Sequence, residues 1–98
     1  MELSRAQHKA FLYKIIALQA DGSPRRHPLE KLDVAIAASK KLAEGSKTTE
    51  QGMIFVDKPV EFNPEEWVFL KDQLGQVTEV SLVEGETLQE LKKLFDKE

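Results

Sequence analysis

The chain has 98 residues, which is the size of one domain, and we predict a single domain over 1–98. Apolar residues at 41% and charged residues at 32% exclude a disordered tail and a membrane protein, and the absence of cysteine excludes disulfides and thiolate sites. The formal charge of −3 is divided unevenly: residues 1–47 carry nine basic and five acidic side chains, and residues 48–98 carry five and twelve.

The first predicted element is a helix over approximately 5–20. Ser4 and Gln7 have the spacing of a capping box, and apolar residues recur at helical spacing from there to Leu18. Gly22 supplies a stop. A strand over 11–19 is the alternative because Phe, Tyr and Ile favour sheets, but the signals at both ends favour a helix.

A second helix is predicted over approximately 28–44. Pro28 suits a first helical turn, where its missing N–H costs nothing. Apolar side chains then follow a helical stripe, and Gly45 closes the helix.

Two short strands are expected next, over approximately 53–56 and 59–62, after a polar loop at 46–51. Asp57 and Lys58 supply the turn of a hairpin, and Pro59 confines the second strand to a sheet edge.

The last part of the chain predicts a helix over 64–74, a strand over 77–83 and a helix over 88–96. Asn63, Pro64 and Glu66 form the clearest helix start in the sequence. Thr87 and Glu90 have the spacing of a further capping box. The predicted fold class is α+β, with about four short helices and a small two- or three-stranded sheet.

No residue pattern indicates catalysis or a cofactor. The glycines are scattered singly, so no phosphate-binding loop is present. The two histidines have no metal-ligand spacing, and the paired glutamates are explained by helix starts. We therefore expect no catalytic, cofactor or metal-binding residues and no enzyme.

The first predicted helix is apolar on more than one side, so it is either central in the fold or covered by a partner. A contact patch for a protein partner or a second copy would consist of Phe11, Leu12, Tyr13 and Ile16, with Phe69 from the third helix.

A basic cluster follows the first helix. Arg25, Arg26, His27 and Lys31 are candidates for contact with phosphate or an acidic partner. The alternative to a protein-binding function is therefore nucleic-acid binding through the basic segments 25–31 and 40–47.

Residues 32–74 resemble a pattern in small bacteriophage proteins of uncharacterised function. The matching residues begin with Leu32-Asp33-Val34-Ala35-Ile36 and Gly45 and continue from Val60 through Asn63-Pro64-Glu65-Glu66 to Phe69-Leu70-Lys71. The resemblance implies a small accessory protein that binds other proteins, during phage assembly or interference with the host.

Together these patterns predict a non-enzymatic interaction or assembly module that associates with itself or docks on a larger partner. The longest apolar stretch is too short to span a membrane and no secretory signal is evident, which predicts the cytoplasm, or the host cytoplasm for a phage protein.

Overall fold

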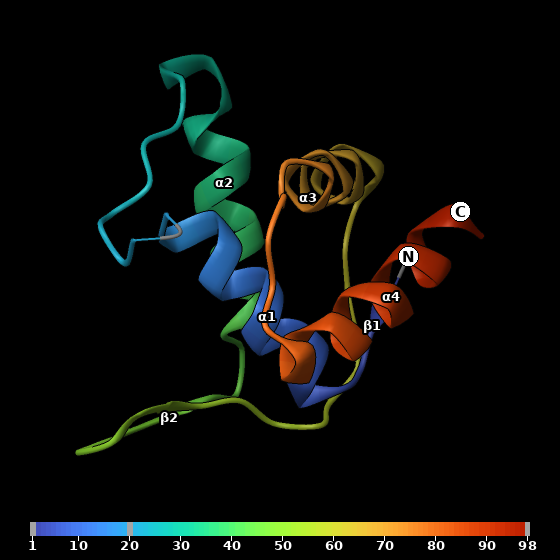
Figure 1. Cartoon of the computed structure of the whole chain (residues 1–98). Helices are drawn as coiled ribbons and strands as arrows, with labels where there is room; N and C mark the ends of the chain where they lie inside the picture. The colour runs from blue at the N-terminus through green and yellow to red at the C-terminus, as the bar shows by residue number, and fades with distance from the viewer. Residues whose placement is uncertain (1, 20, 98) are drawn as a thin grey trace.

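Four helices make up most of the fold. In the computed structural model, which describes residues 2–19 and 21–97, they are joined by two small antiparallel sheets (Figure 1). The helices are α1 (Ala6–Ala17), α2 (Leu29–Leu42), α3 (Pro64–Gly75) and α4 (Leu82–Asp96). The first sheet pairs β1 (Glu2–Leu3) with β4 (Val60–Glu61), and the second pairs β2 (Lys47–Thr49) with β3 (Gly52–Ile54). The predicted α+β class with four helices is confirmed.

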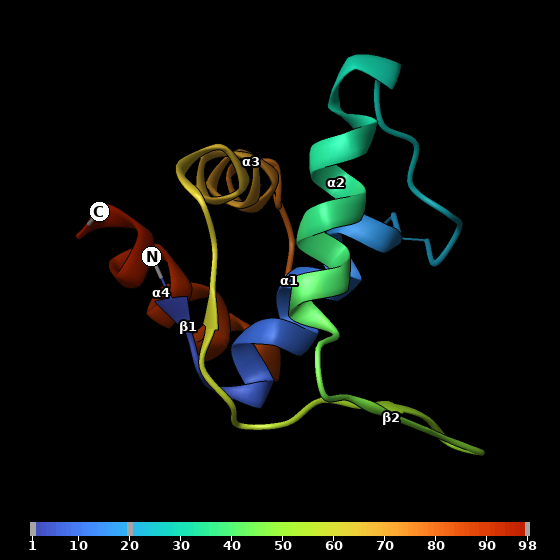
Figure 2. The same cartoon turned by 180° about the vertical axis from the view of Figure 1, so that it is seen from behind.

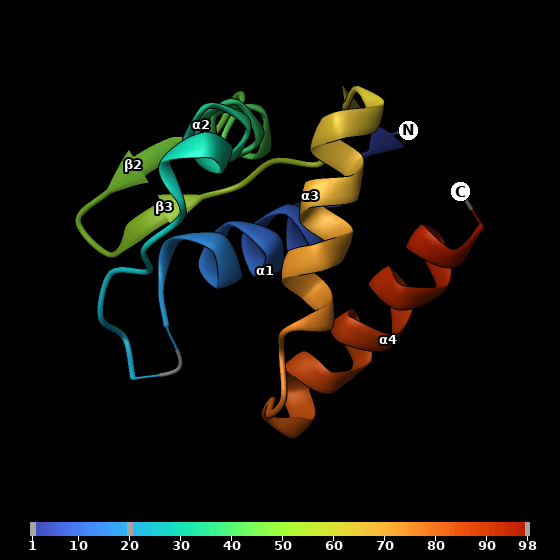
Figure 3. The same ribbon diagram turned by 90° about the horizontal axis from the view of Figure 1, so that it is seen from above.

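The helices α1 and α3 lie in the middle of the molecule. Both α2 and α4 pack on them, from opposite sides, as the view from above shows (Figure 3). The β2–β3 hairpin extends away from this body beyond the C-terminal end of α2 (Figure 2). No other helix or strand of the described residues lies over the outer sides of α2 and α4 (Figure 3).

All four helices and the β1–β4 sheet contribute to one apolar core. Trp67 of α3 lies against Phe95 of α4, with ring centroids 4.3 Å apart, and against Phe62 at 6.2 Å. The buried apolar residues are Leu3, Phe11, Leu12, Ile16, Ala35, Ala38, Leu42, Val60, Phe62, Trp67, Phe69, Leu70, Leu74, Leu91 and Phe95. Burial of this set supplies the main driving force for folding.

Residues 11–17 are helical, so the helical alternative for the first element is confirmed, although its predicted cap is wrong. Arg5 is the N-cap residue and no side chain at that position caps the helix. Instead Asp57, far along the chain, accepts a hydrogen bond of 2.7 Å from the backbone N–H of Ala6. A tertiary contact thus satisfies one of the first N–H groups of the helix, in place of the local capping box predicted at Ser4 and Gln7.

The hairpin predicted for 53–56 and 59–62 is wrong in its pairing. Gly52–Ile54 pairs with Lys47–Thr49 across a two-residue turn. The strand Lys47–Thr49 and the turn both lie in the segment 46–51, which was predicted to be a loop. Val60 pairs with Leu3 near the N-terminus, and both side chains are buried. This pairing of distant segments buries two apolar residues that a local hairpin would have left without a shared core.

The strand predicted over 77–83 is also wrong, as is the start of the last helix. Residues 76–81 form a connection with no strand partner, and α4 begins at Leu82. Ser81 accepts a hydrogen bond of 3.2 Å from the N–H of Glu84, whereas Thr87 lies inside the helix. The β-branched residues favour a strand, but a strand requires a neighbour and the fold supplies none here.

Candidate functional site

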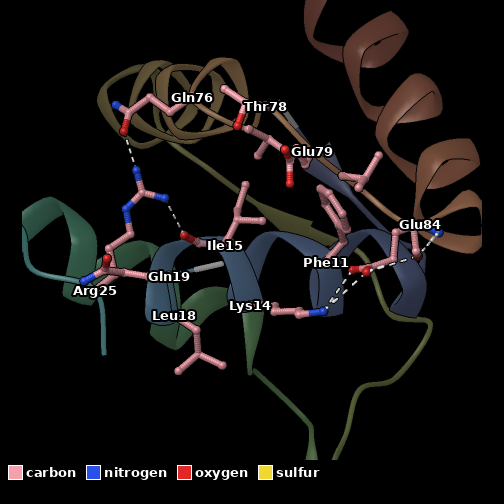
Figure 4. A pocket seen from close by; sticks show the side chains of 13 residues that line it. Phe11, Lys14, Ile15, Leu18, Gln19, Arg25, Gln76, Thr78, Glu79 and Glu84 are labelled. Carbon is pink, nitrogen blue, oxygen red and sulfur yellow. Dashed lines mark hydrogen bonds and ion pairs between the residues drawn. The ribbon is translucent and has the colours of Figure 1, made fainter. Parts of the chain in front are cut away.

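A groove of about 420 Å³ lies between α1 and the connection from α3 to α4 (Figure 4). One wall is formed by α1 and the other by residues 76–81. Its lining residues are Phe11, Lys14, Ile15, Leu18, Gln19, Arg25, Gln76, Val77, Thr78, Glu79, Val80, Ser81 and Glu84. A volume of this size is typical of ligand-binding pockets.

A polar contact bridges the two walls at each end of the groove (Figure 4). At one end Lys14 of α1 forms an ion pair with Glu84 of α4, with 3.1 Å between nitrogen and oxygen. At the other end the Arg25 guanidinium donates to the carbonyl of Ile15 at 2.9 Å and to the side-chain oxygen of Gln76. These contacts hold the connection beside α1 and fix the ends of the groove.

The floor between these bridges is apolar, and the outer wall carries free backbone groups. Phe11 and Ile15 of α1 supply the apolar side chains, together with the partly exposed Leu18. No hydrogen bond joins the backbone of residues 78–80 to any other residue that the structure describes. The wall therefore offers both donors and acceptors beside an apolar surface.

The apolar patch predicted on the first helix does not form a surface. Phe11, Leu12, Ile16 and Phe69 are all buried in the core, and only Tyr13 is half-buried, where its ring lies 5.6 Å from that of Phe55. The helix α1 is apolar on several sides because α2, α3 and α4 all pack against it. Of the two explanations for its composition, centrality in the fold is the one that holds.

Two members of the predicted basic cluster hold the end of α1. Arg25 donates to Ile15 as described, and His27 donates from Nε2 to the carbonyl of Ile16 at 2.8 Å. The last carbonyls of a helix lack partners within it and carry partial negative charge. Arg26 and Lys31 are exposed, and neither side chain forms a hydrogen bond or ion pair with the described part of the chain.

The second basic segment, 40–47, is also divided. Lys41 turns inward and pairs with the buried carboxylate of Glu66 at 2.5 Å. Lys40 and Lys47 are exposed. The six basic residues of the two segments therefore do not form a single exposed basic surface, because two of them contact other residues of the chain.

One buried charge was missed by the sequence analysis. The side chain of Lys9 is fully buried and donates to the backbone carbonyls of Val56, at 3.0 Å, and Lys58. Burial lowers the pKa of Lys9, and the neighbouring charge of Asp57 opposes that shift. Residue 9 stands at helical spacing from Leu12 and Ile16, which places it on the same, buried side of α1. This spacing is the sequence signal that indicates its burial. Lys9 does not line the groove, and its hydrogen bonds hold the 56–58 segment.

Within residues 2–19 and 21–97, no group of three or more histidine or carboxylate side chains is arranged to hold a metal ion. No helix in the same ranges has the length and apolar character needed to cross a membrane. Comparison with protein-family models, curated proteins and solved structures gives no match.

Proposed function

We propose that the protein is a non-enzymatic interaction module that binds an extended segment of a larger partner protein in the groove between α1 and residues 76–81. The observation that carries this proposal is the run of unpaired backbone at 78–80 beside an apolar floor. An extended peptide can add to such a run as a β-strand, through main-chain hydrogen bonds. Val77, Thr78 and Val80 of this extended connection have high strand propensity and suit this role.

The two walls suit a peptide because one can pair with its backbone and the other can contact its side chains. Backbone pairing with residues 78–80 would give affinity that is independent of sequence. Alternate side chains of an extended segment point to opposite faces, so one set would lie over Ile15 and Leu18. Apolar residues at every second position of the partner segment are therefore expected.

Charge adds a further requirement. Glu84 is neutralised by Lys14, whereas Glu79 is exposed and forms no ion pair with the described residues. The second half of the chain carries net negative charge as well. We expect a Lys or Arg of the partner segment to face Glu79, with its attraction weakened by salt.

The nucleic-acid alternative receives less support. The side chains of Arg25 and Lys41 contact other residues of the chain, and the charge of Glu79, which has no ion-pair partner among the described residues, would repel phosphate at the groove. A role as a cytoplasmic accessory protein of a bacteriophage, which the resemblance of residues 32–74 implies, fits a module that acts by docking.

The proposal is tested by selecting linear 12-residue peptides from a phage-displayed library on the immobilised protein. Enriched peptides should alternate apolar residues and contain a basic residue. A synthetic copy should shift the amide NMR signals of residues 76–81 and of Ile15 and Leu18. Failure to enrich any peptide, or shifts confined to other surfaces, would contradict the proposal.

Two proline variants then test backbone pairing. Successive N–H groups of an extended segment point to opposite sides, and proline removes one of them. Of Glu79→Pro and Val80→Pro, one should weaken peptide binding about tenfold and the other should leave it unchanged. Glu79→Ala and Val80→Ala are the matched controls, because they alter the side chain and keep the N–H. Equal loss in both proline variants, or loss in neither, would rule out strand addition.

A further inference from the structure

The outward side of α2 carries an apolar stripe that the rest of the described chain leaves partly exposed. Leu29 is 87% exposed, Ile36 44% and Leu32 38%. At 100° per residue these three positions fall within about 60° of one another, beside the buried side formed by Ala35, Ala38 and Leu42. Figure 2 shows α2 in front of α1 with no element over it.

The same face also carries one acidic and one basic side chain. Asp33 and Lys40 fall with the stripe in a sector of about 100°. They are seven residues apart, about 10 Å along the axis, so they do not neutralise each other within one helix. Neither forms an ion pair with another described residue, whereas the adjacent Lys41 is turned inward to Glu66.

We propose that two copies of this chain pair antiparallel through the outward faces of α2. With the two-fold axis between Ile36 and Ala37, residue 33 of each copy faces residue 40 of the other. Asp33 then meets Lys40 of the second copy, twice by symmetry. Ile36 lies at the centre of the contact, and Leu29 packs over the far end of the second helix.

The charge pattern selects the direction of pairing. A parallel arrangement brings Asp33 against Asp33 and Lys40 against Lys40, which places like charges together. The antiparallel arrangement brings opposite charges together at both positions. The face is therefore complementary to itself in only one orientation, and that identifies a second copy as the occupant.

The contact is small, so the association is weak. One helix face with three large apolar side chains lies at the low end of specific interfaces, and we expect a dissociation constant on the order of 100 µM. No residue of α2 lines the groove. Dimerisation and peptide binding are therefore separate properties that can fail independently.

Sedimentation equilibrium of the full chain from 10 µM to 1 mM measures the association directly. The mean mass should rise with concentration from 11.1 kDa toward twice that value. Ile36→Asp should hold it at the monomer mass, with an unchanged helical circular dichroism signal. A wild-type mass that stays at the monomer value up to 1 mM would overturn the proposal.

Charge reversal tests the register independently of folding. Asp33→Lys and Lys40→Asp should each weaken self-association about tenfold, because each places two like charges together twice. An equimolar mixture of the two variants should restore dimers, since every facing pair is then opposite in charge. The double variant should also restore them. Lys71→Glu on the exposed surface of α3 is the control and should not change the mass. Absence of rescue in the mixture would exclude this register.

Discussion

The helices α3 and α4 begin with the same local motif and differ in what packs over it. Each has a polar N-cap residue followed three positions later by glutamate: Asn63 with Glu66, and Ser81 with Glu84. Both caps accept from the N–H of that glutamate, at 2.8 Å in α3 and 3.2 Å in α4. The Glu66 side chain is only 4% exposed and Glu84 is 34% exposed.

Burial changes the energetic weight of the motif. Glu66 accepts from the backbone N–H of Asn63 at 2.9 Å and from Lys41 of α2 at 2.5 Å, so it ties the start of α3 to another helix. The Glu84 carboxylate pairs with the exposed Lys14 and accepts from the Ser81 hydroxyl at 3.3 Å, so both of its partners are near the surface. Exposed ion pairs contribute little, whereas a buried acceptor that loses its partners is costly. The same motif thus begins both helices, and tertiary packing makes its contribution to stability larger in α3 than in α4.

The largest predicted effect compares the two glutamates directly. Glu66→Ala should lower the free energy of unfolding by about 2–3 kcal/mol, because it removes both hydrogen bonds of the carboxylate and leaves Lys41 without its partner. Glu84→Ala should lower it by about 0.5 kcal/mol. Urea unfolding followed by the fluorescence of the single, buried Trp67 measures both. Glu66→Gln retains an acceptor and should fall between the two; equal losses for both alanine variants would refute the comparison.

Replacing the N-cap residues should also lower the free energy of unfolding more at α3 than at α4, with a smaller difference between the two. Asn63→Ala removes a cap that is part of a complete capping box, and we expect a loss of about 1.5 kcal/mol. Ser81→Ala should cost about 0.5–1 kcal/mol, because the α4 start is more exposed. The same urea titration applies. Asn63→Asp keeps an acceptor and should be close to wild type, and a large loss in that variant would point to an effect other than capping.

A proline at the first position of α4 should bring the stability of its N-terminal turn closer to that of α3. In α3 the first helical position is Pro64, and in α4 it is Leu82, which is 97% exposed. Ser81 has φ −70° and ψ 163°, an extended conformation that the residue before proline prefers. Leu82→Pro should therefore raise stability by about 0.4–1 kcal/mol by restricting the unfolded chain. Leu82→Ala is the control, and a loss of stability specific to proline would contradict the expectation.

The smallest predicted effect is a loss of stability in acid, through the contact that joins α4 to α1. A hydrogen bond with His8 at 2.9 Å, together with the charge of Arg5, holds the pKa of Glu90 below its ordinary value of 4.5. Because the folded pKa is the lower one, this contact adds stability above about pH 4.5 and loses it as the pH falls through the folded pKa.

The comparison variant is Glu90→Gln. Its thermal midpoint should lie below that of wild type at pH 6, and the gap should close as the pH falls from 4.5 toward 3. Glu86→Gln, one turn earlier on the same helix, should show no comparable gap. A gap that is independent of pH would show that the Glu90 charge makes no contribution.

Local chemistry predicted those helices whose signals lie within a few residues of one another. Asn63, Pro64 and Glu66 identified α3 within one residue at its C-terminal end, and helical periodicity identified α1 and α2. The start of α4 was missed because Ser81 and Thr87 both have capping spacing, and strand propensity favoured the wrong one. Propensity is a weak signal where no strand partner exists.

The surfaces were harder to predict than the elements. The residues expected to form an apolar patch became core, since three helices cover α1. The groove joins α1 to the 76–81 connection and the start of α4, which lie more than 50 residues further along the chain. The outward stripe of α2 was visible as periodicity, but only the fold shows which side of that helix is free.

The sequence by itself determined the class of fold, because capping boxes, glycine stops and helical periodicity act between residues that are close along the chain. Tertiary structure alone decided the strand pairing of Leu3 with Val60, the cap that Asp57 provides for α1, and the burial of Lys9 and Glu66. It also gave the basic segment after α1 its role, since Arg25 and His27 reach the last carbonyls of that helix. Each of these contacts joins groups separated along the chain, and their energies depend on burial, which follows only from how the helices pack.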